Sequence, residues 1–118
     1  MRSTDCPGEQ ITMEHVYLET PCGGIQGTRH KGVNRFLGIR YATAKRFEYA
    51  QEITKWDGTY EALNYGPAPI QMRTYPKYRQ ENSHSEKEFL EGVDVTYSED
   101  CLFLNIWAPE NRKNCPVL

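Results

Sequence analysis

The stretch that most constrains the fold lies at residues 98–109. Its centre, residues 102–107, is about as long as one β-strand, and only Asn105 in it is polar. A run of this length and composition predicts a strand that is buried on both faces. A short core helix is the alternative, but Pro109 and the turn-forming residues after it argue against a helix. A strand with two apolar faces needs a covering layer on each side.

The rest of the chain is polar in comparison. Hydrophobic residues make up 38% of the 118 residues and the mean hydropathy is -0.74, so apolar content is low for a globular domain. The aromatic content of 12% is nevertheless too high for a disordered chain. A polar chain with one concentrated apolar stretch is typical of a piece of a larger fold. We therefore expect residues 1–118 to be such a piece.

Charge and segment length exclude several classes of protein. The net charge is -2, with both signs mixed along the chain and no basic stripe, so we expect no nucleic-acid partner. Residues 1–10 lack the apolar core of a signal peptide, and no apolar run reaches membrane-spanning length. We therefore expect a cytoplasmic protein without a membrane segment.

The cysteines stand at positions 6, 22, 101 and 115. An even number permits two disulfides, but none of the spacings is typical of a metal site. Without a secretory signal, free thiols are the favoured interpretation. Whether Cys6, Cys22, Cys101 or Cys115 form disulfides stays open from the sequence alone.

The first half of the chain predicts an antiparallel meander. Strands are expected at 15–20, 25–29 and 33–39, separated by glycine-containing turns. Val33, Phe36 and Ile39 are the core candidates of this meander. Beyond a connector at 48–55, Trp56 is expected to anchor a turn, and residues 59–63 are expected to form a short strand.

The remaining segments have weaker signals. Residues 1–12 are polar and expected to be flexible. Residues 70–97 form a long polar excursion, in which Ser85 to Glu88 is a capping box that predicts one short helix ending near Gly92. Residues 116–118 are expected to begin a further strand.

Several segments together resemble one family. The matching pieces are residues 24–27, 36–42, 46–47, 56–58, 62–67, Gln71 and 98–109. The last of these, beginning Ser-Glu-Asp-Cys-Leu-Phe-Leu-Asn-Ile-Trp, is the most specific. In order and spacing they resemble the N-terminal part of the type-B carboxylesterases, which include the cholinesterases. The resemblance covers roughly residues 14–118.

The resemblance implies an α/β fold, with this chain as the β-rich N-terminal fragment of an α/β-hydrolase. Members of the family hydrolyse carboxylic esters with a serine nucleophile, a histidine base and an acidic third residue, and without a cofactor or metal. Their oxyanion loop follows the strand that is expected to begin at Pro116. The resemblance thus implies that 1–118 stops before the catalytic groups, contains no catalytic residue and is inactive alone.

Three departures from the family pattern stand out. Arg40 stands where members often have a proline, and Cys101 lacks the cysteine that is its usual partner in the family. Residues 72–97 contain no tryptophan, the residue that holds the choline ammonium in cholinesterases. We therefore do not expect selectivity for choline esters.

The resemblance also suggests structural roles. Arg46 and Glu99 occupy positions that form an internal ion pair in relatives, and Cys101 is expected to be a buried strand thiol. The spacing of histidines 15, 30 and 84 is not that of metal ligands, so surface positions are favoured for them. Serines 83, 85 and 98 lack the sequence context of a nucleophile elbow, so capping or turn roles are favoured for them. Tyrosines 75, 78 and 97 with Phe89 are expected either to line a pocket mouth or to pack within the loop.

Two hypotheses of function follow. In the first, the chain is the front part of an esterase whose only ligand is the ester substrate of the full-length protein. In the second, it is a non-catalytic truncated product or a split subunit that binds a complementary C-terminal polypeptide. An unfinished strand would leave sheet edges and apolar surface uncovered in the second case.

Overall fold

A computed structural model describes residues 13–71 and 96–118. The described residues form two sheets, of five and two strands. The strands are β1 (Glu14–Thr20), β2 (Gly23–His30), β3 (Val33–Arg40), β4 (Ala42–Thr43), β5 (Gln51–Glu52), β6 (Thr59–Glu61) and β7 (Phe103–Pro109). The predicted short helix at 85–92 lies outside the described residues. Within them, no helix is long and apolar enough to cross a bilayer.

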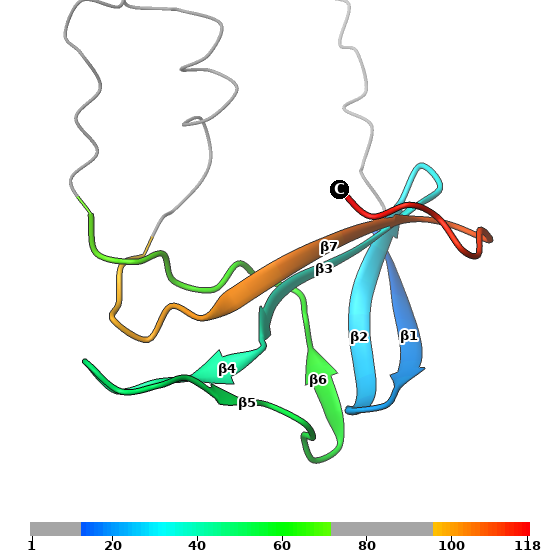
Figure 1. Cartoon of the computed structure of the whole chain (residues 1–118). Helices are drawn as coiled ribbons and strands as arrows, with labels where there is room; N and C mark the ends of the chain where they lie inside the picture. Colours follow the sequence, from blue (N-terminus) through cyan, green and yellow to red (C-terminus); the bar gives the residue numbers. More distant parts are fainter. Residues whose placement is uncertain (1–12, 72–95) are drawn as a thin grey trace, which may run out of the picture.

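The larger sheet has the strand order β1-β2-β3-β7, and all three of these pairings are antiparallel (Figure 1). β6 lies beside β2 in parallel orientation. β4 and β5 make the separate two-stranded sheet, and β5 falls within the connector expected at 48–55. The expected meander over residues 15–39 is confirmed as β1, β2 and β3.

The turn between β2 and β3 shows why the meander forms locally. His30 pairs with Val33, which leaves a two-residue loop of Lys31 and Gly32 with φ angles of 48° and 76°. Positive φ at both loop residues is the type I′ geometry, whose twist matches that of the flanking strands. Gly32 meets this requirement without strain, because glycine has no Cβ to clash at positive φ.

The core lies on one face of the meander. Its buried residues are Val16, Ile25, Phe36, Ile39 and Ala62, with Trp56 and Tyr60 packed against them. Val33 was expected in this core but is 39% exposed, so that expectation was wrong. Val33 follows the turn and pairs with Pro109 at the far end of the β3–β7 ladder, away from the core residues.

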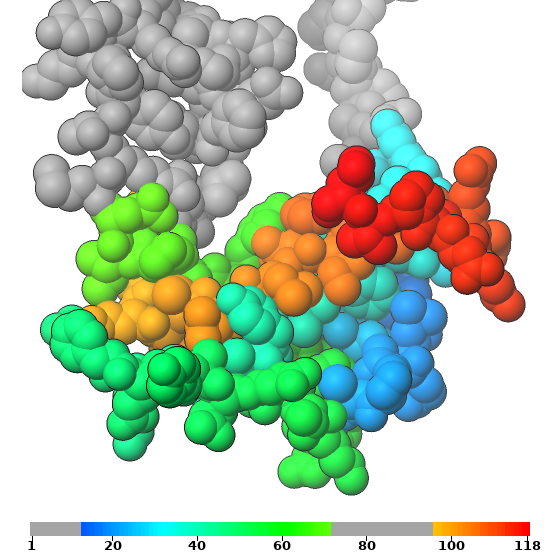
Figure 2. Space-filling view, in the orientation of Figure 1, coloured from blue at the N-terminus to red at the C-terminus, as the bar shows by residue number. Residues whose placement is uncertain are grey.

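β7 differs from its prediction as a strand buried on both faces. Leu104, Ile106 and Trp107 are 37%, 44% and 55% exposed, and Figure 2 shows β7 as a continuous band on the molecular surface. The strand itself exists, but within the described residues it pairs only with β3, and residues 104–107 are exposed. Residues 116–118 form no strand either, and Val117 is 96% exposed.

Asn105, the one polar residue of the apolar stretch, supports an irregularity in the sheet. The β3–β7 register shifts between Phe36 and Ile39, and Gly38 has a φ of +65° there. The Asn105 side-chain oxygen accepts the Gly38 N–H at 2.9 Å. On the other side, Tyr60 donates its hydroxyl hydrogen to the Gly38 carbonyl at 2.7 Å. The two side chains thus satisfy backbone groups that the bulge removes from the ladder.

Candidate functional site

A cavity among the described residues lies where three separate segments meet. Its volume is about 800 Å³. The lining residues come from the loop after β4, the loop before residue 71 and the segment that leads into β7: Ala44, Lys45, Arg46, Pro69, Ile70, Ser98, Glu99, Asp100, Cys101 and Leu102. The specific sequence signature at residues 98–102 therefore forms one whole wall of the cavity.

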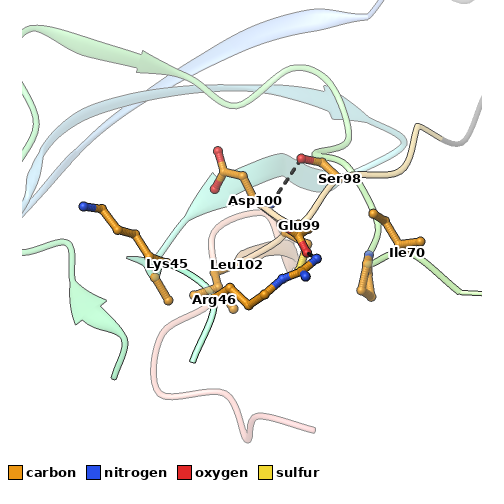
Figure 3. Close-up of a pocket in the computed structure, with 10 residues that line it drawn as sticks. Lys45, Arg46, Ile70, Ser98, Glu99, Asp100 and Leu102 are labelled. Atoms are coloured by element: carbon orange, nitrogen blue, oxygen red, sulfur yellow. Dashed lines mark hydrogen bonds and ion pairs between the residues drawn. The ribbon is translucent and has the colours of Figure 1, made fainter. Parts of the chain in front are cut away.

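Arg46 and Glu99 form an ion pair across this cavity. Figure 3 shows the guanidinium and the carboxylate pointing at each other, with Lys45 extending away from both. The Arg46 and Glu99 side chains are 67% and 59% exposed. Solvent therefore screens the pair, and its contribution to stability is small in this environment.

A second ion pair, which the sequence did not predict, joins β3 to the same wall. The guanidinium of Arg40 binds both carboxylate oxygens of Asp100, with one N–H···O distance of 2.7 Å. The Arg40 guanidinium also lies 4.4 Å from the ring centre of Phe103. A two-pronged contact with stacking on an aromatic ring is a geometry that arginine provides and lysine does not.

This second pair changes the acid–base properties of its members. The hydrogen bonds from Arg40 hold the pKa of Asp100 below its ordinary value. In turn, the hydrogen bond to Asp100 raises the pKa of Arg40 above its ordinary value, against a smaller opposing effect of desolvation. Both groups are therefore charged at neutral pH, and neither is available as a proton donor or acceptor.

Ser98 has a turn role in this wall. Its hydroxyl oxygen accepts the backbone N–H of Asp100 at 3.1 Å, the contact drawn as a dashed line in Figure 3. Such a bond between a serine side chain and an N–H two residues ahead stabilises a turn. It holds Glu99 and Asp100 in the positions from which they reach Arg46 and Arg40.

Of the other residues singled out from the sequence, Cys101 lies at the cavity and Trp56 lies at the core of the meander. Cys101 lines the cavity but is only partly buried and precedes β7, so it is not the buried strand thiol that was expected. Cys22, Cys101 and the exposed Cys115 are all free thiols. Trp56 lies away from the cavity, against the core of the meander, and its ring N–H donates to the Gly24 carbonyl at 2.7 Å. The structure thus brings Arg46, Glu99 and Cys101 together and leaves Trp56 elsewhere.

The residues that line this cavity hold segments of the chain together and do not form a catalytic group. Within residues 13–71 and 96–118, no histidine lines the cavity and no group of side chains suits a metal ion. Its acids are engaged by arginines and its serine by a backbone N–H. Nucleophilic catalysis needs a nucleophile within hydrogen-bond reach of a base, and the lining residues do not provide such a pair.

Comparison with solved structures defines the class of protein. An esterase from Clostridium hathewayi, described as hydrolysing aliphatic aromatic polyesters, matches 81% of this chain with a TM-score of 0.59 and 31% identity. A para-nitrobenzyl esterase structure matches 83% of the chain with a TM-score of 0.59 and 27% identity. These neighbours have the α/β-hydrolase fold, and the described sheet corresponds to a part of it.

Comparison with characterised sequences gives the same result. The bile salt-activated lipase of Mus musculus is 33% identical over 114 residues, which cover 87% of this chain and 16% of the lipase. The para-nitrobenzyl esterase of Bacillus subtilis is 30% identical over 114 residues, covering 90% of this chain and 20% of that enzyme. The sequence profile of the Carboxylesterase family matches residues 14–118.

The chain therefore belongs to the carboxylesterase family. It spans a fifth or less of the length of these relatives. The family resemblance inferred from residues 14–118 is confirmed, and the ion pairs of the cavity wall lie in the segment that carries its most specific signature.

Proposed function

We propose that this chain is the N-terminal sheet of a serine carboxylesterase and that the complete enzyme hydrolyses carboxylic esters. The observation that supports the proposal most strongly is the family match over residues 14–118, which takes in the entire described sheet. Relatives from a bacterium and a mammal, named as an esterase and a lipase, support the same class of substrate.

The reaction proceeds through an acyl-enzyme. A serine oxygen attacks the ester carbonyl carbon while a histidine takes the serine proton, and the alcohol leaves with that proton as the acyl–serine ester forms. Water then attacks the acyl–serine ester, which releases the carboxylic acid and restores the serine. Backbone N–H groups stabilise the oxyanion in both steps. The serine, histidine and oxyanion donors lie outside the described residues.

The residues of this chain have a supporting role in that reaction. The two ion pairs hold the segment 98–102 against β3 and the loop after β4, and this segment leads directly into β7. We propose that the wall they form belongs to the rim of the substrate pocket. The charged groups of the wall position the backbone and do not take part in proton transfer.

Hydrolysis of p-nitrophenyl butyrate tests the proposal. The natural protein, purified from its source, is expected to release p-nitrophenol, and a fluorophosphonate that blocks serine esterases is expected to stop the release. The 118-residue chain alone is expected to match the uncatalysed rate. Turnover by the isolated chain would show that the catalytic groups were wrongly located. A natural protein that is folded but neither hydrolyses the ester nor reacts with the fluorophosphonate would refute the proposed function.

A further inference from the structure

The hydroxyl of Tyr60, on β6, joins two backbone groups of β3. It donates its hydrogen to the Gly38 carbonyl oxygen at 2.7 Å and accepts the Arg40 N–H at 3.1 Å. The ring is partly buried and packs against Trp56, with the ring centres 5.2 Å apart. A phenol has one hydrogen to donate and lone pairs to accept with, so both bonds form together. Tyr60 therefore fixes the backbone of β3 on both sides of Ile39.

The direction of the Arg40 N–H explains why it needs this partner. The next residue, Tyr41, donates its N–H to the Leu102 carbonyl, on the segment that leads into β7. Because backbone groups alternate in direction along a strand, the Arg40 N–H points away from β7 and towards β6. Relatives often have a proline at this position, and a proline has no N–H to donate. The contact with Tyr60 therefore requires a residue other than proline at position 40.

The side chain of Arg40 extends from this fixed backbone to the cavity wall. Its guanidinium binds both carboxylate oxygens of Asp100 and lies 4.4 Å from the centre of the Phe103 ring. Asp100 belongs to residues 98–102, which form one wall of the cavity. A planar guanidinium reaches two carboxylate oxygens only in a narrow range of positions. The ion pair therefore depends on where the β3 backbone holds Arg40.

We propose that Tyr60 is a positioning residue for the cavity wall. Its hydroxyl holds the backbone at Gly38 and Arg40, and the Arg40 guanidinium in turn holds Asp100. These contacts form a continuous path from the core of the meander to residues 98–102. The link to substrate binding rests on the proposed function, in which this wall belongs to the rim of the substrate pocket. Tyr60 then affects how tightly the ester binds and takes no part in the reaction itself.

Hydrogen exchange of the natural protein that contains this chain, followed by mass spectrometry, tests the role of Tyr60 without an activity assay. The backbone N–H groups of Ser98, Asp100 and Phe103 all donate hydrogen bonds, so exchange at 98–103 measures how firmly the wall is held. We expect Tyr60→Phe to speed exchange at 98–103 by about two- to tenfold, which corresponds to the loss of one hydrogen bond.

Two further variants show whether the effect acts through the Arg40 guanidinium. Arg40→Met keeps the backbone N–H and removes the guanidinium, so it should speed exchange at 98–103 and leave Tyr60→Phe without further effect there. Thr20→Val is the matched control, because the Thr20 hydroxyl also donates to a backbone carbonyl and accepts a backbone N–H. Thr20 lies at the end of β1, and its substitution should leave exchange at 98–103 unchanged.

Ester hydrolysis by the same variants tests the link to substrate binding. Tyr60→Phe is expected to raise KM by about two- to tenfold and to change kcat by less than about twofold, because it loosens a wall that binds substrate. The rise should disappear in the Arg40→Met background. Faster exchange with an unchanged KM would overturn the role at the pocket rim. A natural protein without esterase activity would refute the proposed function, and the exchange data alone would then decide the role of Tyr60.

Unchanged exchange at 98–103 in Tyr60→Phe would overturn the positioning role. So would an equal increase in Thr20→Val, or effects of Tyr60→Phe and Arg40→Met that add in the double variant. If Tyr60→Phe fails to fold, exchange at the Arg40 amide of the unsubstituted protein decides instead. Slow exchange supports the bond to the Tyr60 hydroxyl, and exchange at the rate of an unstructured peptide overturns it.

Discussion

Arg40 and Asp100 are the best-defined polar contact of the cavity wall. The pair joins residues 60 positions apart, and Arg40 also lies over the Phe103 ring. The sequence showed only that an arginine stands where relatives often have a proline. The partner could not be predicted, because it depends on β3 and β7 lying in antiparallel register, which is a property of the fold.

The Arg40–Asp100 pair predicts a pH-dependent stability. The folded-state pKa of Asp100 lies below its ordinary value of 3.8. Its contribution to stability is therefore present above that value and is lost as the pH falls through the folded pKa. We expect Arg40→Met to lower Tm at pH 7 and to lower it less at a pH below the folded pKa. Thermal melts over this pH range measure the difference in Tm between Arg40→Met and the unsubstituted chain. Arg112→Met, which changes an exposed arginine after β7, is the control. A Tm difference that stays constant with pH would contradict the contribution of the Arg40–Asp100 pair.

The Arg46–Glu99 pair predicts a weaker coupling. Because both side chains are more than half exposed, we expect a double-mutant cycle of Arg46→Ala and Glu99→Ala to give about 0.2–1 kcal/mol of coupling. A buried pair would instead cost about 3–5 kcal/mol when one partner is removed. Chemical denaturation of the four chains measures the coupling. Additive losses would remove the structural role that we propose for the pair.

Gly38 is the residue on which the geometry of β3 depends. Its φ is +65°, and an added Cβ would lie 2.3 Å from the Asn64 carbonyl oxygen. Gly32 has a similar φ of +76° but open space around it. We expect Gly32→Ala to cost about 1 kcal/mol in stability and Gly38→Ala to cost several times more, because only the second also clashes with backbone. Urea unfolding of both variants tests this, and equal losses would contradict the bulge geometry.

At the scale of the elements, local patterns predicted what local interactions determine. β1, β2 and β3 follow from alternating residues and a two-residue turn, and β6 follows from a short run after Trp56. The parallel pairing of β6 with β2 and the small β4–β5 sheet were not predicted, because neither pairing is set by a tight hairpin turn. Val33 was wrongly assigned to the core, since a strand pattern does not show where a ladder ends.

β7 shows the limit of composition as a guide to burial. Its apolar run correctly predicted a strand, but burial depends on the layers around a strand as well as on its residues. Within the described residues only β3 contacts it along an edge. Among the described residues the apolar side chains Leu104, Ile106 and Trp107 therefore remain partly exposed, although their run predicted burial.

For the whole molecule, we predict that the described sheet is one part of a serine esterase. The family match extends over residues 14–118, whereas this length is 16–20% of the relatives compared here. The sequence predicted the family from the segment 98–109 together with weaker segments before it. We propose that the reacting groups lie outside the described residues, so their geometry could not be predicted from this sequence.

The most direct test is the intact mass of the natural protein before and after treatment with a fluorophosphonate. We predict a mass several times 13.7 kDa that increases by a single phosphonyl group, because one activated serine reacts. A folded natural protein that contains this sequence and keeps its mass unchanged after treatment would contradict the assignment to a serine esterase.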